Sequence, residues 1–128
     1  MNLFTIIAVA SGGAIGATAR FLINRYMNQT FIHTLPLGTL TVNLLGSLCI
    51  GILFAYFHLN ISLSPHLKTF LTTGILGALT TYSTFAIESF FLLESGAYTY
   101  AFVNMALNLF GSIFFAGLGY MVFVQGMK

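Results

Sequence analysis

The 128-residue chain has only 5% charged residues, against roughly 25% in soluble proteins, while 58% of its residues are hydrophobic. With a mean hydropathy of +0.96, this composition excludes a soluble domain and indicates a multi-pass integral membrane protein. The net charge of +2 is too small and scattered for nucleic-acid binding, and the single Cys49 allows neither an internal disulfide nor a cysteine metal cluster.

Four stretches follow one another along the chain without Asp, Glu, Lys or Arg, and each can hold the roughly 20 apolar residues of a membrane helix. They predict helices at about residues 3 to 26, 37 to 57, 65 to 93 and 98 to 124, within one membrane domain covering residues 1 to 128. The N-terminal run is interpreted as a retained first helix rather than a signal peptide, because no Lys or Arg precedes it.

In the first predicted helix, small residues recur every four positions, at Gly12 and Gly16 and again at Gly13 and Ala17. This spacing allows two membrane helices to approach closely. Arg20 continues the first of these stripes. Its guanidinium either extends to the lipid headgroups or faces an aqueous vestibule that attracts anions, and both alternatives remain open.

The second and third predicted helices place polar residues where a bilayer makes them costly. The Asn43 amide in the second helix can hold an anion, orient a neighbouring ring, or pair with a carbonyl of the third helix. In the third helix, "GILGALTTYSTF" (residues 74 to 85) combines glycines with hydroxyl residues. This pattern predicts a broken helix between Gly74 and Thr80, with freed backbone groups that face protein or a cavity.

Tyr82, Phe85 and Glu88 follow one another at intervals of three, so they lie on neighbouring parts of one helix face. Aromatic pairs at this spacing usually pack together. The hydroxyls of Thr81, Ser83 and Thr84 beside the positively polarised ring edges nevertheless suit a small, strongly hydrated anion. An ionised Glu88 would oppose an anion path, so we expect it to be protonated or turned toward polar partners.

Asn104, Asn108 and Ser112 recur every four residues and form one polar stripe along the fourth predicted helix. The stripe either forms interhelical hydrogen bonds or lines a pathway, and it can do both. Enzyme signatures are missing from the sequence, since its three histidines match no metal motif and Ser83 has no nearby His. We therefore expect that the protein is not an enzyme.

Positive charges divide equally between the two sides of a four-helix topology. Lys68 and Lys128 fall on one side, and Arg20 and Arg25 fall on the other. Because neither side has an excess of Lys and Arg, the positive-inside rule predicts no preferred orientation. The chain can insert in both orientations and pair as an antiparallel dimer, or a different signal can select one orientation.

The segments "GGAIGATAR", "GTLTVNLLGS" and "GILGALTTYSTF" closely resemble the Fluc (CrcB) fluoride channels of microbes, and the resemblance covers essentially the whole chain. It implies an all-α membrane protein with four transmembrane helices and a break in the third, assembled as an antiparallel dual-topology homodimer. It also implies a fluoride-selective channel of the cell (inner or plasma) membrane that passively exports cytoplasmic fluoride and gives resistance to its toxicity.

The resemblance further implies a structural sodium ion, held at the dimer interface by main-chain carbonyls of Gly77 and Thr80. The implied fluoride pathway comprises Asn43, Tyr82, Ser83, Thr84, Phe85 and Ser112. The vestibule and its electrostatics are assigned to Arg20 and Glu88, and Asn104 and Asn108 are assigned to the pathway or to packing. The sequence departs from the family at Tyr82, where Phe is usual, and at Asn104, where an aromatic residue is expected.

The main alternative is a small proton-coupled multidrug exporter, which can also be a four-span dual-topology dimer. Such exporters depend on a carboxylate in the first helix and on aromatic residues around a large organic cation. The first predicted helix has no acidic residue and the chain has no Trp, which disfavours this alternative. A non-transporting membrane subunit would explain the glycines but not the clustered hydroxyls.

Overall fold

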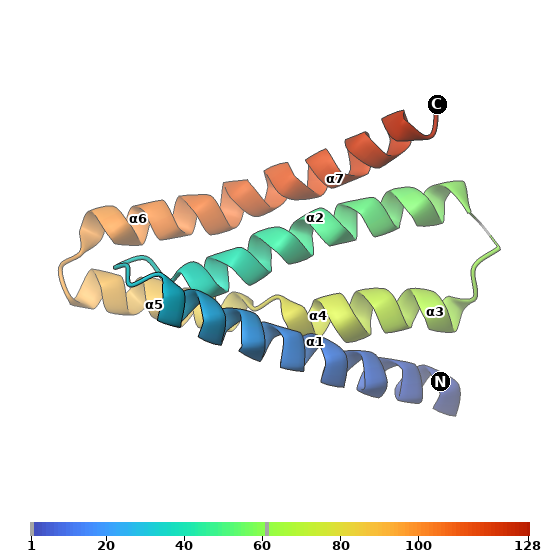
Figure 1. Ribbon diagram of the computed structural model, residues 1–128, viewed down its shortest axis with the longest axis horizontal. Helices are drawn as coiled ribbons and strands as arrows, with labels where there is room; N and C mark the ends of the chain where they lie inside the picture. The colour runs from blue at the N-terminus through green and yellow to red at the C-terminus, as the bar shows by residue number, and fades with distance from the viewer. Residues whose placement is uncertain (1, 61) are drawn as a thin grey trace.

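The computed structural model describes residues 2–60 and 62–128 and shows an all-helical bundle (Figure 1). The elements in chain order are α1 (Leu3–Thr30), α2 (Leu37–Leu59), α3 (Pro65–Thr69), the π-helix η1 (Phe70–Leu76), α4 (Gly77–Leu79), α5 (Tyr82–Glu94), α6 (Tyr98–Ala106), the π-helix η2 (Leu107–Gly111) and α7 (Ser112–Gly126). The elements α3, η1, α4 and α5 form the third span, and α6, η2 and α7 form the fourth.

The four spans are each long and apolar enough to cross a membrane, which confirms the predicted all-α class with four transmembrane helices. The described parts of the α2–α3 loop lie at the same end of the bundle as both termini, while the α1–α2 and α5–α6 loops lie at the opposite end (Figure 1). Helix α1 ends at Thr30 and α2 at Leu59, somewhat beyond the ends expected from the sequence.

One of the two predicted small-residue stripes brings α1 against η1. Gly12 and Gly16 are buried. A Cβ atom on Gly12 would lie 2.5 Å from the Phe70 carbonyl oxygen and 2.9 Å from Gly74 Cα. By contrast, a Cβ on Gly13 would meet nothing within 4 Å. The stripe that begins at Gly13 therefore makes no close helix contact within the described chain, and only the Gly12 stripe has the predicted packing role.

Glycines also set the approach of α2 to α7. A Cβ on Gly51 would overlap the carbonyl of Ala116, and a Cβ on Gly119 would overlap the carbonyl of Leu48. Each glycine thus gives the facing backbone the room that a side chain would occupy. Close backbone approach of this kind is a main source of attraction between helices in lipid, where burying apolar surface brings little gain.

The third span is interrupted at Thr80 and Thr81, whose backbones are extended, with φ/ψ of −80°/155° and −150°/112°. This confirms the predicted break, but the break is shorter and later than expected. Gly74 lies within η1 and packs against α1 instead of interrupting the helix. The break therefore depends on contacts around the two threonines and not on the flexibility of Gly74.

Candidate functional site

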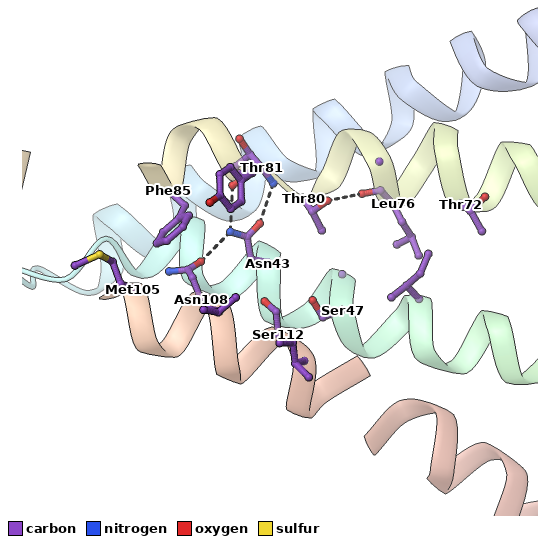
Figure 2. Close-up of a pocket in the computed structure, with 16 residues that line it drawn as sticks. Asn43, Ser47, Thr72, Leu76, Thr80, Thr81, Phe85, Met105, Asn108 and Ser112 are labelled. Carbon is purple, nitrogen blue, oxygen red and sulfur yellow. Dashed lines mark hydrogen bonds between the residues drawn. The ribbon is translucent and has the colours of Figure 1, made fainter. Parts of the chain in front are cut away.

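Asn43 of α2 stabilises the break in the third span by hydrogen bonding to both the N–H and the carbonyl of Thr81. The Thr81 N–H donates to Asn43 Oδ1 at 2.8 Å, and Asn43 Nδ2 donates to the Thr81 carbonyl at 3.1 Å (Figure 2). In a continuous helix the Thr81 N–H would donate to the Gly77 carbonyl. Asn43 therefore leaves the Gly77 carbonyl without its helical hydrogen bond. Asn43 also donates to the Thr81 carbonyl, which agrees with the sequence-based alternative that it pairs with a carbonyl of the third helix.

Thr81 also restarts the helix after the break. Its Oγ1 accepts from the Thr84 N–H at 3.3 Å, as expected for a threonine N-cap of α5. The Thr84 N–H is the group that would have bonded the Thr80 carbonyl in a continuous helix. That carbonyl instead accepts from Arg20 Nη1 at 3.4 Å. Arg20 thus faces the protein at the break, which disfavours the alternative in which it extends to the headgroups.

The break borders a cavity of about 630 Å³ between α2 and the third and fourth spans (Figure 2). The sequence-predicted residues that line it are Asn43, Gly77, Thr80, Thr81, Tyr82, Phe85, Asn108 and Ser112. Two further hydroxyl residues, Ser47 and Thr72, line it as well. Sequence reasoning did not select Ser47, although its position one turn after Asn43 was a usable signal.

Two of the predicted pathway hydroxyls lie outside this cavity wall. Ser83 is exposed, and within the described residues neither Ser83 nor Thr84 belongs to the lining set. The Thr84 hydroxyl accepts a hydrogen bond from Thr81 Oγ1 at 2.9 Å. Thr84 therefore belongs to the N-terminal cap of α5. Most of the hydroxyls that line the cavity come from other elements.

Tyr82 and Phe85 form the aromatic part of the cavity wall. Their ring centroids lie 5.4 Å apart with an interplanar angle of 72°, which is an edge-to-face arrangement. The Tyr82 side chain is 79% exposed in the single chain. The spacing of three residues therefore brings the two rings together as expected, at the start of α5 and next to the break.

A chain of buried side chains, here called the asparagine ladder, connects α2, α5, α6 and η2. Asn43 Nδ2 donates to Asn108 Oδ1 at 2.8 Å, and Asn108 Nδ2 donates to Asn104 Oδ1 at 3.0 Å. Asn104 Nδ2 donates to Ser89 Oγ at 3.0 Å, and Ser89 Oγ donates to the Phe85 carbonyl at 2.8 Å. Of the predicted polar stripe, Asn104 and Asn108 thus form interhelical hydrogen bonds.

Glu88 lies apart from the main cavity. Thr39 Oγ1 donates to Glu88 Oε1 at 2.8 Å, so the carboxyl is turned toward a polar partner. Within the described residues, Oε2 is buried without a hydrogen-bond partner. Glu88 also lines a second cavity of about 380 Å³ near the α1–α2 loop. Sequence reasoning did not select Thr39, although it precedes Asn43 by one helical turn.

Comparison with known proteins gives matches over nearly the whole chain. A family model described as "CrcB-like protein, Camphor Resistance (CrcB)" matches residues 7–120. A Sulfurimonas denitrificans protein named "Fluoride-specific ion channel FluC" is 53% identical over 128 residues, which cover 100% of this chain and 99% of the relative.

Two further relatives carry the same name. The Campylobacter jejuni protein is 46% identical over 121 residues, covering 94% of this chain and 98% of its own. The Shewanella woodyi protein is 46% identical over 114 residues, covering 89% and 91%. Because the family model and these relatives match from the first span to the last, the chain belongs to the CrcB-like protein family, the Fluc (CrcB) family that its motifs resemble.

Proposed function

We propose that this protein is a fluoride-selective ion channel that exports cytoplasmic fluoride passively. The observation that carries the proposal is the break at Thr80 and Thr81, which borders a cavity lined by hydroxyls and by the Tyr82 and Phe85 rings. The printed name of the relatives, fluoride-specific ion channel, supports the same substrate.

The direction of transport follows from electrostatics and acid–base chemistry. In acidic surroundings, fluoride crosses the membrane as neutral HF. In the more alkaline cytoplasm HF dissociates, and fluoride is trapped there as an anion. A negative-inside potential favours anion exit by roughly 2.3 kcal/mol per charge per 100 mV, so an open pathway is sufficient and no pump is required.

Selectivity over chloride requires a narrow path that replaces the water around fluoride with fixed polar groups. The Ser47 and Ser112 hydroxyls and the Tyr82 and Phe85 rings line the cavity and supply groups of this kind. Since chloride is larger and more weakly hydrated, it gains less from such donors and loses more in a narrow passage.

The test is release of fluoride from liposomes that contain the purified protein, recorded with a fluoride electrode after an ionophore removes the voltage limit. We expect fluoride release well above that of protein-free liposomes, with chloride retained in a parallel recording. Release no faster than from empty liposomes, by protein that is folded and has its native oligomeric state, would overturn the proposal.

The working unit in this proposal is an antiparallel dual-topology homodimer. Two features of the single chain support a partner at the cavity. Tyr82 is 79% exposed although it belongs to the site. A Cβ on Gly77 would meet only the Thr72 carbonyl oxygen, at 3.5 Å, so contacts within the described chain do not require glycine there. A second copy facing the cavity would account for both features.

The proposed structural sodium ion fits the chemistry of the break. The helical hydrogen-bond partners of the Gly77 and Thr80 carbonyls bond elsewhere, to Asn43 and Thr81, and both residues line the cavity. The Thr80 carbonyl also accepts from Arg20 Nη1 at 3.4 Å, so only its second lone pair is left for a cation. Carbonyl oxygens are hard ligands that suit a hard cation. Within the described residues, no group of three His, Cys, Asp or Glu side chains could hold a metal ion, so main-chain oxygens are the better candidates.

Two carbonyls from one chain are few for a cation, so two copies would share one ion, and bound sodium would stabilise the dimer. A ligand that binds only the assembled form raises its apparent stability with concentration. We expect the dimer's melting temperature to rise with sodium, compared with N-methyl-D-glucamine at equal ionic strength. Identical melting temperatures in the two cations would contradict the sodium site and leave the fluoride proposal standing.

A further inference from the structure

The asparagine ladder of Asn43, Asn108, Asn104 and Ser89 begins and ends on the same short segment. At its first end, Asn43 is bonded to the N–H and carbonyl of Thr81. At its other end, Ser89 Oγ donates to the Phe85 carbonyl. Tyr82 directly follows the first attachment point, and Phe85 carries the second.

The direction of every bond in the ladder follows from Thr81. The Thr81 N–H requires an oxygen, so Asn43 presents Oδ1 to it and presents Nδ2 to the Thr81 carbonyl and to Asn108. Asn108 then accepts from Asn43 and donates to Asn104. Hydrogen bonds aligned head to tail in a low-dielectric interior polarise and strengthen one another.

Segment 81–89 needs an external attachment because the break removes its helical connection to α4. Without helical hydrogen bonds across Thr80 and Thr81, α4 does not fix the rotation of α5, which then depends on its turn into α6 and on tertiary contacts. Asn104 is fully buried, with 0% exposure, and Ser89 is also buried. Within the described residues, neither belongs to the cavity lining, so an ion in the cavity does not touch them.

We propose that Asn104 and Ser89 are positioning residues that hold the Tyr82–Phe85 ring pair in its edge-to-face orientation through the ladder. Asn104 occupies the position where the family resemblance led us to expect an aromatic residue, and its amide joins α6 to α5 through Ser89. The functional importance of the ring orientation rests on the proposed fluoride pathway, but the orientation can be measured independently of transport.

The test places 3-fluorotyrosine at position 82 and records its ¹⁹F resonance in the full-length purified protein. Ser89→Ala removes one hydroxyl from the ladder, and Asn104→Leu removes the amide. We expect both variants to shift the Tyr82 resonance and to broaden or split it, because α5 loses its side-chain hydrogen bond to Asn104 of α6. Ser89→Thr retains the hydroxyl and should restore the parent resonance.

Ser11→Ala is the matched control, since Ser11 Oγ donates to a carbonyl four residues earlier, as Ser89 does, but belongs to α1 outside the ladder. A Tyr82 resonance that is unchanged in folded Ser89→Ala, or changed equally in Ser11→Ala, would overturn the proposal. If Asn104→Leu does not fold, the Ser89→Ala resonance alone tests the proposal.

In the liposome assay, Ser89→Ala should also reduce discrimination against chloride. A parent protein that releases no fluoride would contradict the channel function without altering the resonance result.

Discussion

Asn43 uses three of the four hydrogen-bonding positions of its amide within the protein, including both N–H donors. Both N–H groups are engaged, with the Thr81 carbonyl and with Asn108 Oδ1, and the oxygen accepts from the Thr81 N–H. An anion in the cavity therefore meets no free N–H on this side chain. The arrangement favours a role in which Asn43 shapes the break and orients the neighbouring ring segment, and it leaves recognition of fluoride to hydroxyls and ring edges.

Replacement of Tyr82 by Phe should speed fluoride release while selectivity over chloride is retained. The Tyr82 ring lines the cavity, and its hydroxyl can add one donor to the path. Conduction requires that each site bind weakly enough for the ion to leave. Loss of a neutral hydrogen bond worth about 0.5–1.5 kcal/mol should raise the rate about two- to tenfold, measured as initial release per protein in liposomes.

Tyr26→Phe is the control for this change, because Tyr26 is an exposed tyrosine near the end of α1, outside the cavity lining. It should leave the release rate unchanged. Slower release in Tyr82→Phe, or leakage of chloride, would show that the hydroxyl instead assists fluoride passage or selection.

The sequence predicted which residues share a helix face but not which side chains meet across helices. The spacing of Tyr82 and Phe85 was sufficient to place their rings together. Pairing of Asn43 with a carbonyl of the third helix was one alternative, but no spacing identified Thr81 as its partner. Nor did any spacing indicate that Asn104 would bond to Ser89. Such pairs depend on the rotation of each helix about its axis, and the nearly continuous hydrophobicity of a membrane helix gives little information on that rotation.

At the scale of elements, the approach of α1 to η1 depends on one of two adjacent glycines. Gly12→Ala places a Cβ 2.5 Å from the Phe70 carbonyl oxygen and 2.9 Å from Gly74 Cα, and both are backbone atoms that cannot rotate away. We expect Gly12→Ala to lower the free energy of unfolding by about 1–3 kcal/mol. The measurement is a detergent-denaturation titration followed by circular dichroism.

Gly13→Ala is a control of identical chemistry one residue away, where the added Cβ meets nothing within 4 Å. It should leave stability unchanged or raise it by about 0.5–1 kcal/mol, because alanine is the better helix former. Equal destabilisation by the two substitutions would mean that the packing of α1 on η1 does not depend on this close approach.

The element pattern was largely predictable, since lengths of uncharged, apolar sequence determine which segments can span a bilayer. The exact break was not predictable from composition alone. Gly74 was expected to interrupt the helix, but it packs closely against the backbone of α1. The interruption occurs where Asn43 and the Thr81 hydroxyl replace helical hydrogen bonds, and both interactions depend on tertiary structure.

For the whole molecule, the distribution of positive charge supports insertion in both orientations. Lys68 belongs to α3 and Lys128 is the last residue, and both α3 and the C-terminus lie at the end of the bundle that contains both termini (Figure 1). Arg20 and Arg25 belong to the second half of α1, which leads to the opposite end. Because the two sides balance, the positive-inside rule selects neither orientation, and we predict that new chains insert both ways. A mixed population is what an antiparallel dimer requires, since each pair needs one chain of each orientation.

This prediction can be tested with single cysteines at the two ends of the bundle in a Cys49→Ala background. Ser62→Cys lies in the α2–α3 loop and Ser95→Cys at the α5–α6 loop, and both serines are exposed. A membrane-impermeant maleimide applied to intact spheroplasts should label about half of the chains in each variant, because the charge balance sets no orientation. Permeabilisation should make the remaining chains reactive.

The labelled fractions should respond to added charge in opposite directions. Gln29→Arg adds a positive charge to the end of α1 beside the α1–α2 loop, so it should retain that side in the cytoplasm more often. Labelling of Ser62→Cys should then rise above half and labelling of Ser95→Cys fall below it. Fluoride release should fall in parallel, since oppositely oriented partners become scarce. Complete labelling of one cysteine and none of the other, before any charge is added, would establish a single orientation and exclude the antiparallel dimer.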